Sequence, residues 1–108
     1  MSTEYEDAIE GVFAASQQEI ENINRLNDEA QRLMDNEEVN DEKMDEISFE
    51  MERNLSLIEE RICHARNEFY AKIAPKKDRM EQLEAFEDYL EEKLKEYGLQ
   101  SEEEEEQS

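Results

Sequence analysis

The stretch "MDEISFEMERNLSLIEERICHARNEFYAKI", residues 44 to 73, decides the fold of this chain. Apolar or small residues recur through it with a mean spacing close to 3.6 residues, the repeat of an α-helix that buries one face. These residues are Met44, Ile47, Met51, Leu55, Ile58, Ile62, Ala65, Phe69 and Ile73. The pattern predicts a long amphipathic helix over about residues 42–74.

A second stripe precedes this helix. Its members are Ile9, Val12, Phe13, Ser16, Ile20, Ile23, Leu26, Ala30, Leu33 and Met34. Thr3 and Glu6 match a capping box, so we expect one helix over about residues 4–34. The segment "DNEEVND", residues 35–41, interrupts the pattern, and either Asn40 or Asp41 can cap the next helix. We predict a loop in which the chain reverses; continued helix is the alternative.

The segment "FYAKIAPKKDR", residues 69–79, holds the only proline. Proline lacks an N–H and disfavours helical angles in the residue before it, so Pro75 predicts a sharp kink or a tight turn. Beyond it a third stripe follows, made of Met80, Leu83, Phe86, Leu90, Leu94 and Tyr97. We expect a helix over about 75–97, with Pro75 in its first turn and Gly98 as its C-cap.

These patterns predict an all-α protein with two or three long amphipathic helices, arranged as a helical hairpin or in a coiled-coil-like way. The helical domain would cover residues 1–98, and the glutamate-rich segment 99–108 would be a disordered acidic tail. A thin hairpin buries little apolar surface. We therefore expect a homodimer or a subunit of a helical complex.

Charge limits the class of partner. The 108 residues include 33 acidic and 12 basic ones, for a formal net charge of −21. Such a chain repels nucleic acid and anionic membrane, so we expect no direct contact with either. A basic protein, or the DNA-binding surface of a nucleic-acid enzyme, is favoured instead. The single cysteine and the absence of a long apolar run predict a cytoplasmic or nuclear protein.

Two charged segments are candidates for partner binding. The first is the tail, with Glu102, Glu103, Glu104, Glu105 and Glu106. The second is a basic stretch that holds half of the basic residues, Arg61, Arg66, Lys72, Lys76, Lys77 and Arg79. This stretch is open to three interpretations, which are neutralisation of acids on the first helix, a binding patch, and simple solvation. The first is favoured, because the first helix carries an excess of acid.

No pattern predicts catalysis. Cys63 and His64 are the only thiol and imidazole, and neighbours on a helix point about 100° apart, too far for a nucleophile and its base. One cysteine and one histidine also fall short of a zinc site. We expect no catalytic residue, no cofactor and no metal, and hence no enzyme.

Parts of the chain resemble known families. The segments "IENINRLNDEA" (20–30) and "NEFYAKIAPKKDR" (67–79), followed by the glutamate tail, resemble the N-terminal dimerisation helix of the nucleosome assembly protein/SET family of histone chaperones. The segment "KIAPKKDRMEQLEAF" (72–86) is similar to a helical hairpin of the phage Gam family of host-nuclease inhibitors. Its part "PKKDRMEQLEAF" (75–86) is similar to the start of the Borealin family of chromosomal passenger subunits. No functional residue carries over from these resemblances.

Charge, helical pattern and resemblance together predict a non-enzymatic interaction protein that binds a basic protein, with a histone as the most concrete partner. Two alternatives stay open. The chain could be a DNA-mimicking inhibitor of a nucleic-acid enzyme such as a nuclease, or a helical scaffold subunit of a larger complex.

Overall fold

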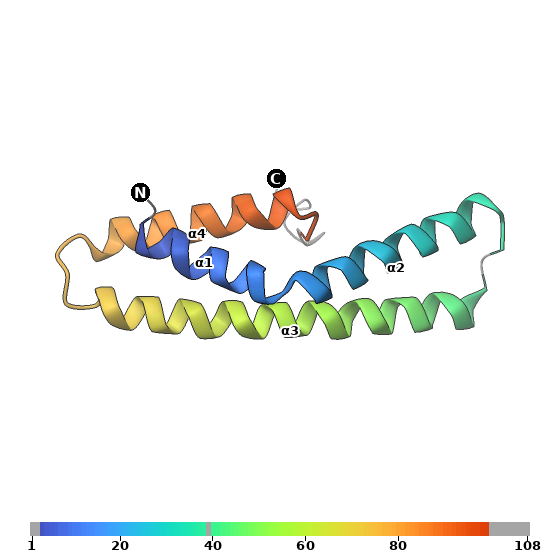
Figure 1. Cartoon of the computed structure of the whole chain (residues 1–108), viewed down its shortest axis with the longest axis horizontal. Coiled ribbons are helices and arrows are strands. Elements are labelled where there is room, and N and C mark those ends of the chain that lie inside the picture. Colours follow the sequence, from blue (N-terminus) through green and yellow to red (C-terminus); the bar gives the residue numbers. More distant parts are fainter. Residues whose placement is uncertain (1–2, 39, 100–108) are drawn as a thin grey trace. The chain divides into compact units, whose positions relative to one another are not determined.

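A computed structural model describes residues 3–38 and 40–99. They form four helices and no strand: α1 (Glu4–Ala15), α2 (Gln17–Asp35), α3 (Asp41–Ile73) and α4 (Arg79–Glu96) (Figure 1). The all-α prediction is therefore confirmed. The prediction of two or three helices is wrong, because the helix expected over residues 4–34 is divided at Ser16.

Ser16 ends one helix and begins the next. Its backbone lies at φ −105° and ψ 11°, outside the helical range. The N–H of Ser16 donates to the carbonyl of Phe13 at 3.2 Å, and the side-chain amide of Gln17 donates to the same carbonyl at 3.2 Å. Its own carbonyl accepts the N–H of Ile20 at 2.9 Å, the first bond of the following helix. The backbone groups freed by the break are thus satisfied locally.

Side chains cap the start of two helices. Thr3 and Glu6 form the expected capping box, in which the Glu6 N–H donates to the Thr3 hydroxyl at 3.3 Å and the Thr3 N–H donates to the Glu6 carboxylate at 3.3 Å. At the start of α3 the Asn40 side chain accepts the N–H of Lys43 at 2.8 Å. Of the two residues proposed as the cap of this helix, Asn40 is therefore the one that caps it.

Two helices end in the same hydrogen-bond pattern. After α4, Gly98 has φ +72°, and the N–H groups of Gly98 and Leu99 donate to the carbonyls of Lys95 and Leu94. This pattern is a Schellman motif, in which Tyr97 is the C-cap and Gly98, predicted as the C-cap, is the left-handed residue directly after it. Leu99 is buried, so the packed part of the chain extends one residue beyond the predicted end of the helical domain at residue 98. Residues 100–108, the rest of the predicted disordered tail, lie outside the described residues.

The end of α2 repeats this motif without glycine. Glu37 has φ +56°, and the N–H groups of Glu37 and Glu38 donate to the carbonyls of Met34 and Leu33. A side chain is strained at such an angle, where glycine is not.

Pro75 lies in a turn, and not within a helix. The N–H of Lys76 donates to the carbonyl of Ile73 at 2.8 Å, which closes the turn directly after α3. The helix predicted to begin at Pro75 begins instead at Arg79, with Asp78 as its cap residue. The intervening residues 74–78 are irregular, because the proline cannot supply a helical N–H.

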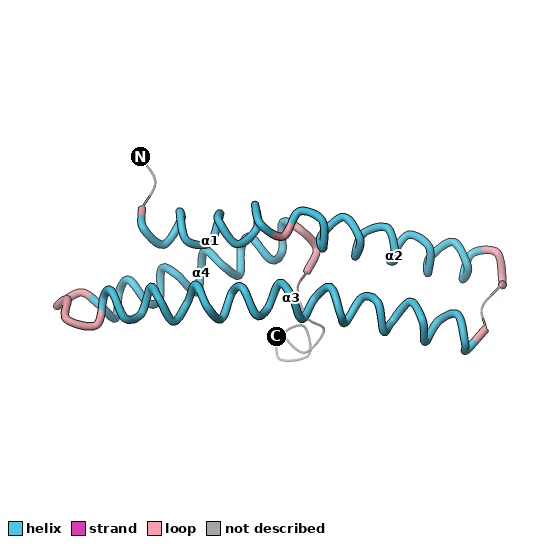
Figure 2. The backbone as a smooth tube through the Cα atoms, turned by 60° about the horizontal axis from the view of Figure 1, so that its bottom comes forward, coloured by secondary structure: helices cyan, strands magenta, loops and turns pink. Residues whose placement is uncertain are grey.

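The described residues divide into two compact units, one within Val12–His64 and one made of residues 3–11 and 65–99. In the first unit, α2 and the beginning of α3 run side by side in opposite directions, joined by the loop after Asp35 (Figures 1 and 2). Their contact includes a cluster of buried residues, Leu26, Ala30, Leu33 and Ile47, with Met44 and Met51 packed against it. Met34, placed in the same stripe by its spacing, is 48% exposed.

In the second unit, α4 runs back along the end of α3 (Figure 2). Phe69 of α3 stacks on Phe86 of α4, with ring centroids 5.0 Å apart. The first turns of α1 join this unit through Tyr5, whose ring meets Tyr89 edge-on at 5.8 Å. Met80 is 70% exposed, so its expected place in the apolar stripe of α4 is wrong.

Candidate functional site in the α2–α3 pair

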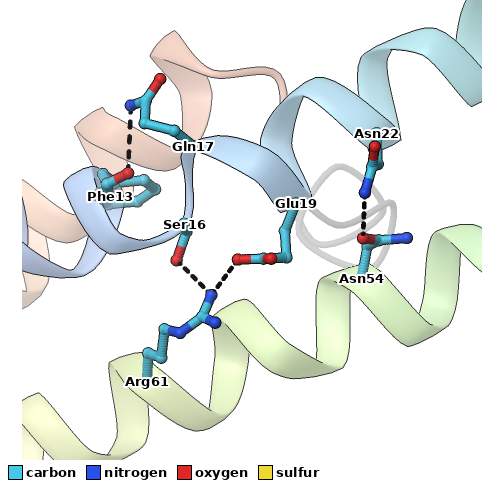
Figure 3. Close-up of polar contacts among 7 residues, drawn as sticks. All are labelled: Phe13, Ser16, Gln17, Glu19, Asn22, Asn54 and Arg61. Carbon is cyan, nitrogen blue, oxygen red and sulfur yellow. Dashed lines mark hydrogen bonds and ion pairs between the residues drawn. The ribbon is translucent and has the colours of Figure 1, made fainter.

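Arg61 joins α3 to the residues around the break at Ser16 (Figure 3). Its guanidinium donates to the Ser16 hydroxyl at 3.1 Å and forms an ion pair with Glu19. Ser16 is fully buried, and the Glu19 side chain is only 14% exposed. One cation therefore satisfies two polar groups that have little access to water.

A second polar contact lies further along the same pair of helices (Figure 3). The Asn22 side chain donates to the Asn54 side-chain oxygen at 3.1 Å, and the Asn54 amide donates to the carbonyl of Glu50 at 2.7 Å. Asn54 is buried although it is polar. A satisfied polar pair at a helix contact favours one register of the two helices, because a shifted register would leave it unpaired.

The six basic residues proposed as a patch are distributed over both units. Arg61 lies in the unit Val12–His64, and the other five lie in the other unit. Arg66 makes a two-pronged contact with Glu87 of α4, at 3.0 Å from Nε and 2.9 Å from a terminal nitrogen. Arg61 and Arg66 thus serve internal neutralisation. Glu19, the partner of Arg61, lies on the first predicted helix, as expected. Glu87, the partner of Arg66, lies on α4 instead.

The other basic residues are exposed. Lys72 lines a shallow hollow with Glu4 and Glu68, within the unit that contains α4. Lys76 and Lys77 lie in the turn after α3, and Arg79 donates to the backbone carbonyl of Lys76 at 3.3 Å. The structure brings Lys76, Lys77 and Arg79 together by sequence proximity around Pro75.

The acidic residues of the α2–α3 pair have a different environment. From Asp35 to Glu60 the sequence contains eleven acidic residues and only two basic ones, Lys43 and Arg53. All eleven are exposed, and none from Glu37 to Glu60 forms an ion pair with any described residue. We call Asp35–Glu60 the acidic segment. It comprises Asp35, Glu37, Glu38, Asp41, Glu42, Asp45, Glu46, Glu50, Glu52, Glu59 and Glu60.

The acidic segment was missed as a site in the sequence, although the signal is a simple count of charge along residues 35–60. The acidic residues predicted to bind a partner, Glu102–Glu106 of the tail, lie outside the described residues. The partners of Arg61 could not be found in the same way, because Ser16 and Glu19 are 45 and 42 residues away in the sequence.

Two tyrosines have perturbed acidity. Burial raises the pKa of Tyr70, and the Glu87 carboxylate, 3.2 Å from its hydroxyl, raises it further. Burial and the hydrogen bond to Glu10, at 2.8 Å, likewise raise the pKa of Tyr89. Both hydroxyls remain protonated donors at neutral pH, so these contacts serve packing between helices.

The one thiol and the one imidazole of the chain are neighbours in the sequence. Cys63 and His64 are both exposed on α3. Within residues 3–38 and 40–99, no three His, Cys, Asp or Glu side chains are grouped so that they could hold a metal ion. No described helix combines the length and the apolar character needed to span a bilayer.

Comparison with known proteins found no match for this chain among protein-family models, curated proteins or solved structures.

Proposed function

We propose that this chain is a non-enzymatic interaction protein that binds a basic protein through the acidic segment, Asp35–Glu60. The observation that carries the proposal is that the eleven carboxylates of this segment are exposed, with only two basic residues among them. None of the carboxylates from Glu37 to Glu60 forms an ion pair with a described residue. Negative charge that is not neutralised within the molecule is available to a cationic partner.

The electrostatic field of this segment suits a lysine- or arginine-rich surface. Exposed carboxylates attract cations over about one Debye length, roughly 8 Å at physiological ionic strength. Complementary charge raises the rate of encounter and selects among partners more than it adds affinity. A histone or another basic tail is the most concrete partner of this chemistry, as in a histone chaperone.

A second candidate rests on the spacing of the same carboxylates. From Asp41 to Glu60, α3 carries eight acidic residues. Those 20 positions span about 30 Å, so one carboxylate occurs per ~4 Å of helix axis, against one phosphate per ~3.4 Å of a DNA strand. This similarity favours a DNA-mimicking inhibitor over a scaffold subunit as the alternative function.

The test compares two variants with the same change in net charge. The first neutralises part of the acidic segment through D45N, E46Q, E50Q and E59Q. The control neutralises exposed acids of α4 through E81Q, E84Q, D88N and E92Q. We expect the first variant to weaken binding of purified core histones about tenfold, because four exposed pairs at a few tenths of a kcal/mol each sum to ~1.4 kcal/mol. The control should bind almost as the original chain does.

Equal weakening in both variants would mean that net charge alone matters, and would contradict a site on α3. Absence of histone binding, together with inhibition of a DNase that the first variant loses, would support the DNA mimic. Binding that is insensitive to salt and to both variants would point to a scaffold subunit.

A further inference from the structure

One side of α3 exposes apolar side chains. Phe49 is 66% exposed and Leu57 is 40% exposed, within the unit Val12–His64. Both line a shallow hollow on the helix surface, together with Glu52, Arg53, Ser56 and Glu60. We call these six residues the outer face. Residues 47 and 58, by contrast, are buried within this unit.

The outer face is ordered in a way that makes it complementary to itself. Along this face, residues of different character follow one another at steps of three or four residues. They are the apolar Phe49, the cationic Arg53, the neighbouring Ser56 and Leu57, and the anionic Glu60. Residues at these steps lie on one side of a helix. If a second copy runs in the opposite direction, the order of its side chains is reversed, and unlike groups meet.

We propose that the outer face binds a second copy of this chain, with the two α3 helices antiparallel and a two-fold axis passing between Ser56 and Leu57. In this register, Arg53 of each copy lies opposite Glu60 of the other. Phe49 lies opposite His64 of the second copy, and Ser56 lies opposite Leu57. A two-fold interface repeats each of these contacts twice.

Charge also selects the direction of pairing. In a parallel two-fold pair, each residue of the face would meet its own counterpart, so Arg53 would face Arg53 and Glu60 would face Glu60. Like charges opposite each other are destabilising.

Two factors make this dimer weak. Each chain has a formal charge of −21, and this repulsion is only partly screened at physiological ionic strength. A face of about four helical turns is also smaller than a standard interface. Association should therefore be measured at about 100 µM chain, where a complex of micromolar affinity is populated.

The decisive experiment is sedimentation equilibrium of the full chain with exchanged charges, without any basic partner. We expect R53E alone and E60R alone each to raise the dimer dissociation constant at least about tenfold, since each creates two like-charge contacts. An equimolar mixture of the two variants should dimerise again, and so should the double variant R53E/E60R. Rescue within one chain is excluded, because seven residues separate the two positions by roughly 10 Å along the helix.

Phe49→Ser should also weaken the dimer, whereas Met80→Ser, which removes an equally exposed apolar side chain from α4, should not. Circular dichroism checks that every variant keeps its helix content. A chain that is monomeric at this concentration, or a mixture that is not rescued, would overturn the proposal. If the chain is monomeric and Phe49→Ser weakens histone binding, the face belongs to another protein, and the dimer is again ruled out. Loss of the dimer with histone binding intact would leave the proposed function standing.

Discussion

Arg61 is the residue on which the contact between α2 and α3 near the helix break depends. Its guanidinium serves both the buried Ser16 hydroxyl and the nearly buried Glu19 carboxylate. Removing one partner of such a contact costs more than the contact contributes, because the remaining groups stay desolvated without a bond.

We predict that Arg61→Ala lowers the free energy of unfolding by about 1–2 kcal/mol, a value reduced because the Arg61 side chain is itself 36% exposed. Arg53→Ala on the same helix is the matched control, since Arg53 is exposed and makes no ion pair with a described residue; its effect should stay within about 0.5 kcal/mol. Urea unfolding below the concentration at which the chain associates measures both. Equal effects would show that the Arg61 contact is not formed in solution.

Glu37 offers a stabilising change. At φ +56° its side chain is strained, and the acidic group also lies at the negative end of the α2 dipole. We predict that Glu37→Gly raises the free energy of unfolding by about 0.5–1 kcal/mol. Glu38→Gly, one position further and without positive φ, should be neutral or destabilising. Thermal melts of the two variants would contradict this account if Glu38→Gly stabilised the chain as much as Glu37→Gly.

At the scale of elements, Pro75 shapes the connection between α3 and α4. It lies in the turn that begins at Ile73, where a fixed φ restricts the unfolded chain without straining the folded one. We predict that Pro75→Ala lowers the free energy of unfolding by about 0.4–1 kcal/mol. If Pro75 lay in a kinked helix, Pro75→Ala would instead raise the free energy of unfolding, because alanine would restore a helical N–H. A melting temperature that rises would therefore contradict the turn.

The elements could be predicted where the signal is local. The stripe from Met44 to Ile73 gave α3 almost to its ends, and Thr3 and Gly98 marked their caps by residue type. The break at Ser16 could not be predicted, because nothing near it forbids helix and its partner Arg61 is remote in the sequence. Met80 fits the helical spacing of α4, but it lies in the first turn of this helix and is 70% exposed.

Of the candidate site, only the excess of negative charge could be predicted from the sequence. A count along the chain locates the acidic segment, but its exposure depends on which side of α3 packs on α2. Likewise, the excess of acid on the first helix predicted that this helix neutralises the basic stretch 61–79, whereas Arg61 pairs with Glu19 and Arg66 pairs with Glu87 of α4, in different units. Long-range ion pairs are set by packing, and local composition does not encode them.

For the molecule as a whole, we propose that the exposed carboxylates of the acidic segment bind the partner. The tail 100–108 is a separate source of negative charge. A truncation that separates the two should end after Leu99, because Leu99 is buried and its N–H completes the cap of α4. Ending the chain at Gly98 would remove this residue and confuse tail loss with damage to the fold.

The most direct test is the affinity for core histones of the full chain and of the 1–99 truncation, measured by isothermal titration over a series of salt concentrations. We predict that the affinity of both falls as salt rises, and that the truncation keeps most of the binding seen with the full chain, because the acidic segment is intact. Binding that disappears with residues 100–108, or that does not change with salt, would contradict the claim that the acidic segment is the site.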